Sequence, residues 1–75
     1  MSEVKGDAKL VMMANQIATF FASQRHADPV EGVRNHLRLF WEPRMRKAII
    51  AHLQGGGEGL DPVAKAAVEK LAAGA

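Results

Sequence analysis

The stretch Phe40-Trp41-Glu42-Pro43-Arg44-Met45-Arg46 lies near the middle of the chain and determines how its helices are divided. Proline lacks a backbone donor and disfavours helical geometry at the residue before it. We therefore expect one helix to end near Trp41 and the next to begin at Pro43. The stretch also holds the only tryptophan, together with the residue types that are enriched at buried protein–protein contacts. It therefore indicates an interaction surface as well as a helix boundary.

The residues before this stretch predict a second helix with a clear start. In Asp28-Pro29-Val30-Glu31, Asp28 can cap the helix, Pro29 suits its first position, and Glu31 can complete a capping box. Apolar residues then recur at helical spacing. They are Val30, Val33, Leu37 and either Phe40 or Trp41. The stripe predicts a helix from Pro29 to about Trp41 with one face in the core.

Another helix is expected nearer the start of the chain, from about Ala8 to Ser23, with residues 1–7 flexible. Its apolar stripe consists of Leu10, Met13, Ile17 and Phe20 or Phe21, and its polar face holds Asn15, Gln16, Thr19 and Ser23. A short connection over residues 24–27 follows.

Two further helices are expected after Pro43. The first aligns Met45, Ile49 and Leu53. Glu42 can cap it, although glutamate is a poorer cap than aspartate because its side chain is longer. The glycines of Gly55-Gly56-Gly57-Glu58-Gly59 end it and form a flexible connection. Asp61-Pro62 then repeats the cap-and-proline start, for a helix to about Ala72 that aligns Val63, Ala67 and Leu71. The sequence therefore predicts an all-α fold, a small bundle of about four short helices in a single domain over residues 1–75, with its ordered core over about 8–72.

Size and composition limit what the chain can do. A core built from 75 residues contributes only about 3–5 kcal/mol of stability, so a partner is expected to add some. The chain has no cysteine, so disulfides and thiolate metal sites are excluded. It shows neither a signal peptide nor an apolar run long enough to span a bilayer, which predicts a cytoplasmic protein without a membrane segment.

Catalytic and cofactor motifs are missing from the sequence. His26, His36 and His52 lack the spacing that would place two ligands on one helix face, and we expect them to be solvated surface residues. The glycine-rich segment leads into Leu60-Asp61-Pro62 instead of the Gly-Lys-Ser/Thr of a phosphate-binding loop. We therefore expect a non-catalytic chain that binds no metal or cofactor itself.

A basic segment leaves three interpretations open. Between residues 34 and 47, one acid, Glu42, stands among five cations. The cations are Arg34, Arg38, Arg44, Arg46 and Lys47. Helix, proline turn and helix could dock on DNA, but a net charge of +2 is small for a binder driven by phosphate contacts. A solvated face and a protein partner for the arginines are the other two interpretations, and nucleic acid is the least favoured.

Apolar residues outside the core stripes point to a second buried surface. Neighbouring aromatics on a helix lie about 100° apart, so one of Phe20 and Phe21, and one of Phe40 and Trp41, should reach the edge of the domain. Leu39 and Met12 also lie away from their stripes. Either a partner covers these side chains or they are ordinary exposed residues of a loosely packed core.

Three blocks of sequence, in order, resemble one family. The blocks are Met13-Ala14-Asn15-Gln16-Ile17-Ala18-Thr19-Phe20-Phe21, then Val33-Arg34-Asn35-His36-Leu37-Arg38-Leu39-Phe40-Trp41-Glu42-Pro43-Arg44-Met45-Arg46, then Gly56-Gly57-Glu58-Gly59-Leu60-Asp61-Pro62. Together they resemble the delta subunit of soluble, NAD-dependent, molybdenum-containing formate dehydrogenase, over roughly residues 10 to 70. Glu42 departs conservatively from the aspartate that is common before this proline in the family.

The resemblance implies a non-catalytic accessory subunit. In that family the alpha subunit holds the molybdenum cofactor and iron–sulfur clusters, and the beta and gamma subunits hold FMN, further clusters and the NAD site. The delta subunit is expected to dock on the alpha subunit and to support assembly, stability or cofactor insertion. The residues that we expect at this contact are Phe40, Trp41, Pro43, Arg44, Met45 and Arg46, with Asn15 and Gln16 as secondary polar contacts or as an ordinary solvated face. The alternative is a small basic helical nucleic-acid-binding domain.

Overall fold

Four α-helices follow the boundaries that the prolines and glycines impose. They are α1 (Ser2–Ala22), α2 (Pro29–Phe40), α3 (Pro43–Gln54) and α4 (Pro62–Gly74). The computed structural model describes residues 2–24 and 28–74, with side chains from Asp7 onward, and these residues form no strand. The predicted all-α bundle of four helices is confirmed.

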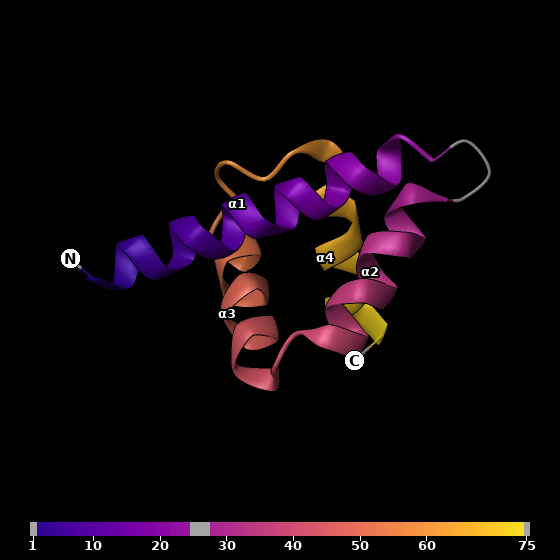
Figure 1. Ribbon diagram of the computed structural model, residues 1–75. Coiled ribbons are helices and arrows are strands. Elements are labelled where there is room, and N and C mark those ends of the chain that lie inside the picture. Colours follow the sequence, from indigo (N-terminus) through magenta and orange to yellow (C-terminus); the bar gives the residue numbers. More distant parts are fainter. Residues whose placement is uncertain (1, 25–27, 75) are drawn as a thin grey trace.

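The helices form a small bundle in which α1 lies across the other three (Figure 1). α2 packs against α1 and α4, and α3 packs against the same two helices. The loop that leads into α4 passes beside α1, and the first turns of α1 extend beyond the bundle (Figure 1). α1 and α4 together therefore hold α2 and α3 in place.

The predicted aspartate caps are confirmed at two helix starts. Asp28 Oδ1 accepts hydrogen bonds from the backbone N–H groups of Val30, at 3.0 Å, and Glu31, at 3.3 Å. Asp61 Oδ1 accepts one from the Ala64 N–H at 2.8 Å. Glu42 occupies the same position before α3 but makes no side-chain cap hydrogen bond. The expectation for Glu42 was wrong, because the longer glutamate side chain is a poorer cap than aspartate.

α1 differs from its predicted form at its start and in its buried face. It begins at Ser2, six residues before the expected Ala8, since Gly6 costs a helix only about 1 kcal/mol and does not end it. The flexibility predicted for residues 1–7 stays a prediction. The most buried side chains of α1 are Val11, Ala14 and Ala18. The predicted stripe flanks them, since its residues Leu10, Met13, Ile17 and Phe21 are only partly buried against the core.

One hydrophobic core joins all four helices. Its buried members are Val11, Ala14, Ala18, Val33, Leu37, Trp41, Ile49, Ala64, Ala67, Val68 and Leu71. Four of these eleven residues are alanines of α1 and α4, so small side chains line much of the contact between these helices. Small residues let helices approach closely but bury little apolar area each. The core therefore fixes the arrangement of the helices with a modest hydrophobic contribution.

The glycine-rich loop ends α3, as predicted. Gly57 and Gly59 have φ angles of +68° and +88°, which glycine adopts at no steric cost. The Gly57 N–H donates to the His52 carbonyl at 2.9 Å, and the His52 Nε2 lies 2.7 Å from the Glu58 carbonyl oxygen. These hydrogen bonds connect the loop to the end of α3. The flexibility predicted for this connection stays a prediction.

Candidate functional site

The two pairs of neighbouring aromatics divide between core and surface. Trp41 is only 5% exposed, whereas Phe40 is 71% exposed, and Phe20 is 58% exposed beside a half-buried Phe21. Trp41 ends α2, and its N–H donates to the Leu37 carbonyl at 3.1 Å. The prediction that one residue of each pair reaches the edge of the domain is confirmed.

Aromatic rings from α1 and α2 form a continuous strip at the surface. We call Phe20, Phe21, His36 and Phe40 the aromatic strip. The ring centroids are 5.1 Å apart for Phe20 and Phe21, 6.3 Å for Phe21 and His36, and 4.8 Å for His36 and Phe40. His36 is half-buried within this strip, so it is not the freely solvated side chain that we expected. The strip presents two exposed phenyl rings, Phe20 and Phe40, on neighbouring helices.

Two further apolar side chains are exposed outside the core. Leu39, beside Phe40 on α2, is 73% exposed, and Met12 on α1 is 53% exposed. Both were predicted to lie away from the core stripes, and their exposure confirms this. Single exposed apolar residues are ordinary, but Leu39 and Phe40 are consecutive, so the end of α2 exposes two large apolar side chains.

Gly32 sets the distance between α1 and α2 beneath the aromatic strip. A Cβ atom at this position would lie 2.5 Å from Phe21 Cδ1 and 3.0 Å from Phe21 Cγ. The absent side chain is therefore what lets the Phe21 ring lie against α2. Gly32 was not among the predicted functional residues, although a glycine inside a well-capped helix is itself a signal of close packing.

The structure divides the predicted partner-binding stretch into exposed and internally bonded residues. Phe40, Pro43 and Arg44 are exposed, and Met45 is half-buried against the core. Arg46 is half-buried, and its Nη1 donates to the carbonyl oxygens of Arg38, at 3.1 Å, and Trp41. Partner binding by these residues stays a prediction, but of the two aromatics only Phe40 is available at the surface.

Asn15 and Gln16, predicted as secondary polar contacts, have different surroundings. The Asn15 Nδ2 donates to the Gly59 carbonyl at 2.8 Å, and its Oδ1 accepts from the Asp61 N–H at 2.9 Å. Asn15 thereby ties the glycine-rich loop and the start of α4 to α1. Gln16 is exposed. Asn15 already has an internal role, which leaves Gln16 as the freer of the two for a contact.

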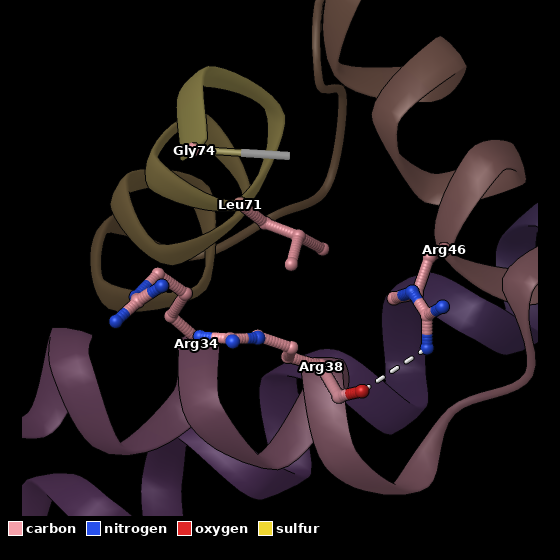
Figure 2. Close-up of a pocket in the computed structure, with 5 residues that line it drawn as sticks. All are labelled: Arg34, Arg38, Arg46, Leu71 and Gly74. Atoms are coloured by element: carbon pink, nitrogen blue, oxygen red, sulfur yellow. Dashed lines mark hydrogen bonds between the residues drawn. The ribbon is translucent and has the colours of Figure 1, made fainter.

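Three arginines gather around a pocket between α2, α3 and the end of α4 (Figure 2). The pocket has a volume of about 360 Å³ and is lined by Arg34, Arg38, Arg46, Leu71 and Gly74. Figure 2 shows the Arg34 and Arg38 side chains lying along α2 below α4, with Arg46 reaching from α3 to the Arg38 carbonyl. The structure thus brings together three of the five cations of the basic segment.

Glu31 links two helices instead of completing a capping box. Its carboxylate pairs with Arg34 on α2 and lies 3.5 Å from Lys70 Nζ on α4. The hydrogen bond from Arg34 lowers the pKa of Glu31 below its ordinary value of 4.5, and the charges of Arg34 and Lys70 act in the same direction. The capping-box prediction was wrong because two cations compete for the carboxylate.

The part of the chain that the structure describes offers neither a cluster of metal ligands nor a helix that could cross a membrane. No group of three or more histidine, cysteine, aspartate or glutamate side chains there could hold a metal ion. His26 lies outside the described residues. Within the described residues, no helix has both the length and the apolar character to cross a bilayer.

Comparison with known proteins identifies the family. The comparison with curated proteins and the comparison with solved structures gave no match. A family model does match, described as "NADH-dependant formate dehydrogenase delta subunit FdsD", over residues 9–68 of the 75. This range takes in α2 and α3 entirely and most of α1 and α4. With the three ordered sequence blocks inside the match and a four-helix fold built on them, the chain belongs to the family of delta subunits of NAD-dependent formate dehydrogenase.

Proposed function

We propose that this delta subunit is a non-catalytic accessory chain that binds the large molybdenum-containing alpha subunit of formate dehydrogenase. The contact is made by the aromatic strip together with Leu39. By binding there, the chain supports assembly or stability of the complex, or insertion of the cofactor. The molybdenum cofactor, iron–sulfur clusters, FMN and NAD are then held by the alpha, beta and gamma subunits and not by this chain.

The observation that carries the proposal is the exposure of Phe20, Leu39 and Phe40 in a chain that belongs to a subunit family. Large aromatic side chains surrounded by other contacts are the usual anchors of protein interfaces. Fully burying one phenylalanine or leucine side chain contributes about 1.5–3 kcal/mol. Three such side chains on adjacent turns and helices can supply much of a specific contact, after the cost of association is subtracted.

The burial of Trp41 changes how the central stretch is expected to work. Trp41 fills the core at the end of α2, and so it cannot also fill a pocket on a partner. Its neighbour Phe40 is consequently directed outward, next to His36. In this account Trp41 positions the binding surface and Phe40 makes the contact.

The nucleic-acid alternative gains little support from the basic segment. Arg34 pairs with Glu31, and Arg46 bonds two backbone carbonyls. Arg44 and Lys47 are exposed on α3, while the two exposed phenylalanines belong to α1 and α2. Arg44 and Lys47 therefore lie on a different helix from the exposed rings, whereas base stacking combined with phosphate contact requires cations interleaved with aromatic side chains.

The proposal is tested by measuring how tightly the chain binds the purified alpha subunit. Phe40→Gln replaces an exposed ring by a polar side chain of good helix propensity, so the fold should be retained. We expect the dissociation constant to rise by a factor of about 30 or more, which corresponds to about 2 kcal/mol. Biolayer interferometry or calorimetry gives the constant, and circular dichroism checks the fold.

Lys65→Gln is the matched control, because Lys65 is exposed on α4, a helix that contributes no residue to the aromatic strip. It should leave the dissociation constant within a factor of about two. Equal affinity of wild type and Phe40→Gln would reject the aromatic strip as the contact. Failure of the wild-type chain to bind the alpha subunit, with tight and steeply salt-dependent binding to an oligonucleotide, would favour the alternative.

A further inference from the structure

We propose that Arg34, Arg38 and Arg46 form a binding site for a diphosphate-bearing small molecule. The proposal is independent of the protein contact described above, and it assigns a ligand to the pocket in Figure 2. It rests on the convergence of three guanidinium groups, on their hydrogen-bonding state and on the volume that they enclose.

The three arginines come from two helices and line one pocket. Arg34 and Arg38 are one turn apart on α2, so they share a face of that helix, and Arg46 belongs to α3. Leu71 and Gly74 of α4 complete the lining, and the pocket measures about 360 Å³. This volume falls within the roughly 300–1,000 Å³ that small-molecule sites commonly have.

The charges at the pocket do not balance. Among the described residues, no acidic side chain lines it. Glu31 neutralises one charge nearby but is shared between Arg34 and Lys70. The end of α4 carries about half a negative charge from its free carbonyl groups, which is less than a single arginine supplies. A surplus of positive charge therefore remains at the pocket.

Two of the arginines are fixed and one has donors to spare. Arg46 is held by the carbonyl oxygens of Arg38 and Trp41, and Arg34 by Glu31. The guanidinium of Arg38 has no hydrogen-bond or ion-pair partner among the described side chains and backbone groups. Each guanidinium carries five N–H donors, so all three can still donate to a ligand. Arginines that are already held in place lose less conformational entropy when a ligand binds.

These properties favour a diphosphate over a single carboxylate. One arginine satisfies a carboxylate through two parallel hydrogen bonds, so three arginines would be more than it needs. A diphosphate carries several negative charges spread over two phosphorus centres and offers many acceptor oxygens. Leu71 adds an apolar wall, and Pro43 and Ile50 line an adjoining hollow that shares Arg46 and Leu71 with the pocket. These groups could contact whatever the diphosphate is attached to.

The arginine pocket and the aromatic strip lie on different flanks of α2. From Arg34 to His36 the helix turns by about 200°, at about 100° per residue. Arg34 and Arg38 face the pocket, whereas His36 faces Phe21 on α1 and the Phe40 ring lies beside His36. A substitution at one site is therefore expected to leave the other unchanged, and the two proposals can fail separately.

The test measures binding of inorganic pyrophosphate to the full chain. Isothermal titration calorimetry gives the dissociation constant, and shifts of the NMR amide signals locate the site. Arg38→Gln is the informative variant, because it removes the unpartnered guanidinium and keeps a long side chain. We expect its dissociation constant for pyrophosphate to be at least tenfold higher than that of the wild type. Shifted amide signals should cluster around Arg38, Arg46 and Leu71.

Arg44→Gln is the matched control, since Arg44 is exposed on α3, does not line the pocket, and loses the same charge. It should weaken pyrophosphate binding by no more than about twofold. Three outcomes would overturn the proposal: no pyrophosphate binding at millimolar concentration, equal losses in the two variants, or binding of succinate as tightly as pyrophosphate. Much tighter binding of a single-stranded oligonucleotide, weakened equally by both substitutions, would also overturn it, in favour of a nucleic-acid surface.

Discussion

At the scale of single residues, neighbours in the sequence have opposite roles in this protein. Phe40 and Trp41 are adjacent, yet one is exposed and the other lies in the core. Asn15 and Gln16 are adjacent, yet one bonds the loop before α4 and the other is exposed. Each pair therefore offers a test in which one member serves as the control for the other.

Trp41→Ala is expected to destabilise the fold far more than Phe40→Ala. Removing a buried tryptophan side chain costs about 3–5 kcal/mol, a large part of the about 4–11 kcal/mol typical of a domain of this size. Phe40→Ala should change the free energy of unfolding by no more than about 0.5 kcal/mol, as exposed positions usually do. Urea unfolding followed by circular dichroism measures both. Similar losses for the two variants would contradict the division between core and surface.

Asn15→Ala is expected to lower the free energy of unfolding by about 2 kcal/mol. The variant loses two hydrogen bonds to the loop and leaves the half-buried Asp61 N–H without its acceptor. Gln16→Ala is the control and should be nearly neutral. Thermal unfolding of the two variants gives the comparison. Equal midpoints for Asn15→Ala and Gln16→Ala would show that the hydrogen bonds from Asn15 to Gly59 and Asp61 do not stabilise the fold.

At the scale of helices, the contact between α1 and α2 depends on the missing side chain of Gly32. Alanine would favour the helix by about 1 kcal/mol, but its Cβ would lie 2.5 Å from Phe21 Cδ1. Overpacking of this kind typically costs about 1–3 kcal/mol. We therefore expect Gly32→Ala to be net destabilising and to displace the Phe21 ring.

Gly74→Ala is the control for this substitution, because nothing lies within 4 Å of a Cβ there. It should be neutral or slightly stabilising in the same unfolding measurement. A Gly32→Ala variant at least as stable as the wild type would show that Phe21 moves away without cost and that the close approach is unimportant.

Glu31 makes the connection between α2 and α4 sensitive to acid. Its pKa is lowered in the folded state, mainly by the hydrogen bond from Arg34. A lowered carboxyl pKa stabilises the fold at pH values above the unfolded pKa, and this contribution is lost as the pH falls through the folded pKa. The loss should therefore begin below about the ordinary value of 4.5 and increase with further acidification.

Glu31→Gln should remove that dependence and flatten the acidic side of the stability curve. The measurement is the free energy of unfolding of the wild type and of Glu31→Gln as a function of pH. The difference between wild type and variant should shrink as the pH falls below 4. A difference that stays constant from neutral pH to pH 3 would contradict the assigned role of the Glu31 carboxylate.

The sequence was sufficient to predict the helices, but not which of their side chains lie in the core and which lie at the surface. Asp28-Pro29 and Asp61-Pro62 act locally, so their helix starts could be read directly from the chain. The start of α1 has no comparable cap and proline, and it was placed six residues too late. Which of Phe40 and Trp41 would be buried depends on the rotation of α2 against α1 and α4, which periodicity fixes only to within a residue. The bond from Asn15 to Gly59 joins residues 44 positions apart, and no local pattern could reveal it.

At the scale of the whole molecule, the fold presents two surfaces from one small core. The aromatic strip lies on one flank of α2 and the arginine pocket on the other. The core between them includes many small side chains of α1 and α4, so the domain has modest hydrophobic stability of its own. A chain of this kind gains stability when a partner covers its exposed apolar surface.

The gain in stability upon binding is itself measurable. We expect the melting temperature of the delta chain to rise when the alpha subunit is added in excess, because a ligand that binds only the folded state stabilises it by mass action. Amide hydrogen exchange can be followed for the amides of the delta chain separately from those of its partner. It should be slower throughout α2 when the alpha subunit is bound. Unchanged exchange in α2 at saturating alpha subunit would contradict binding at the aromatic strip.

The most direct test of the central claim is site-specific photo-crosslinking in cells that express the whole enzyme. A photoreactive phenylalanine analogue replaces Phe40, which keeps the ring, and in a parallel strain it replaces Lys65. Our account predicts a crosslink from position 40 to the molybdenum-containing alpha subunit and none to that subunit from position 65. Crosslinks from position 40 to other proteins or to nucleic acid, with the alpha subunit absent, would contradict it.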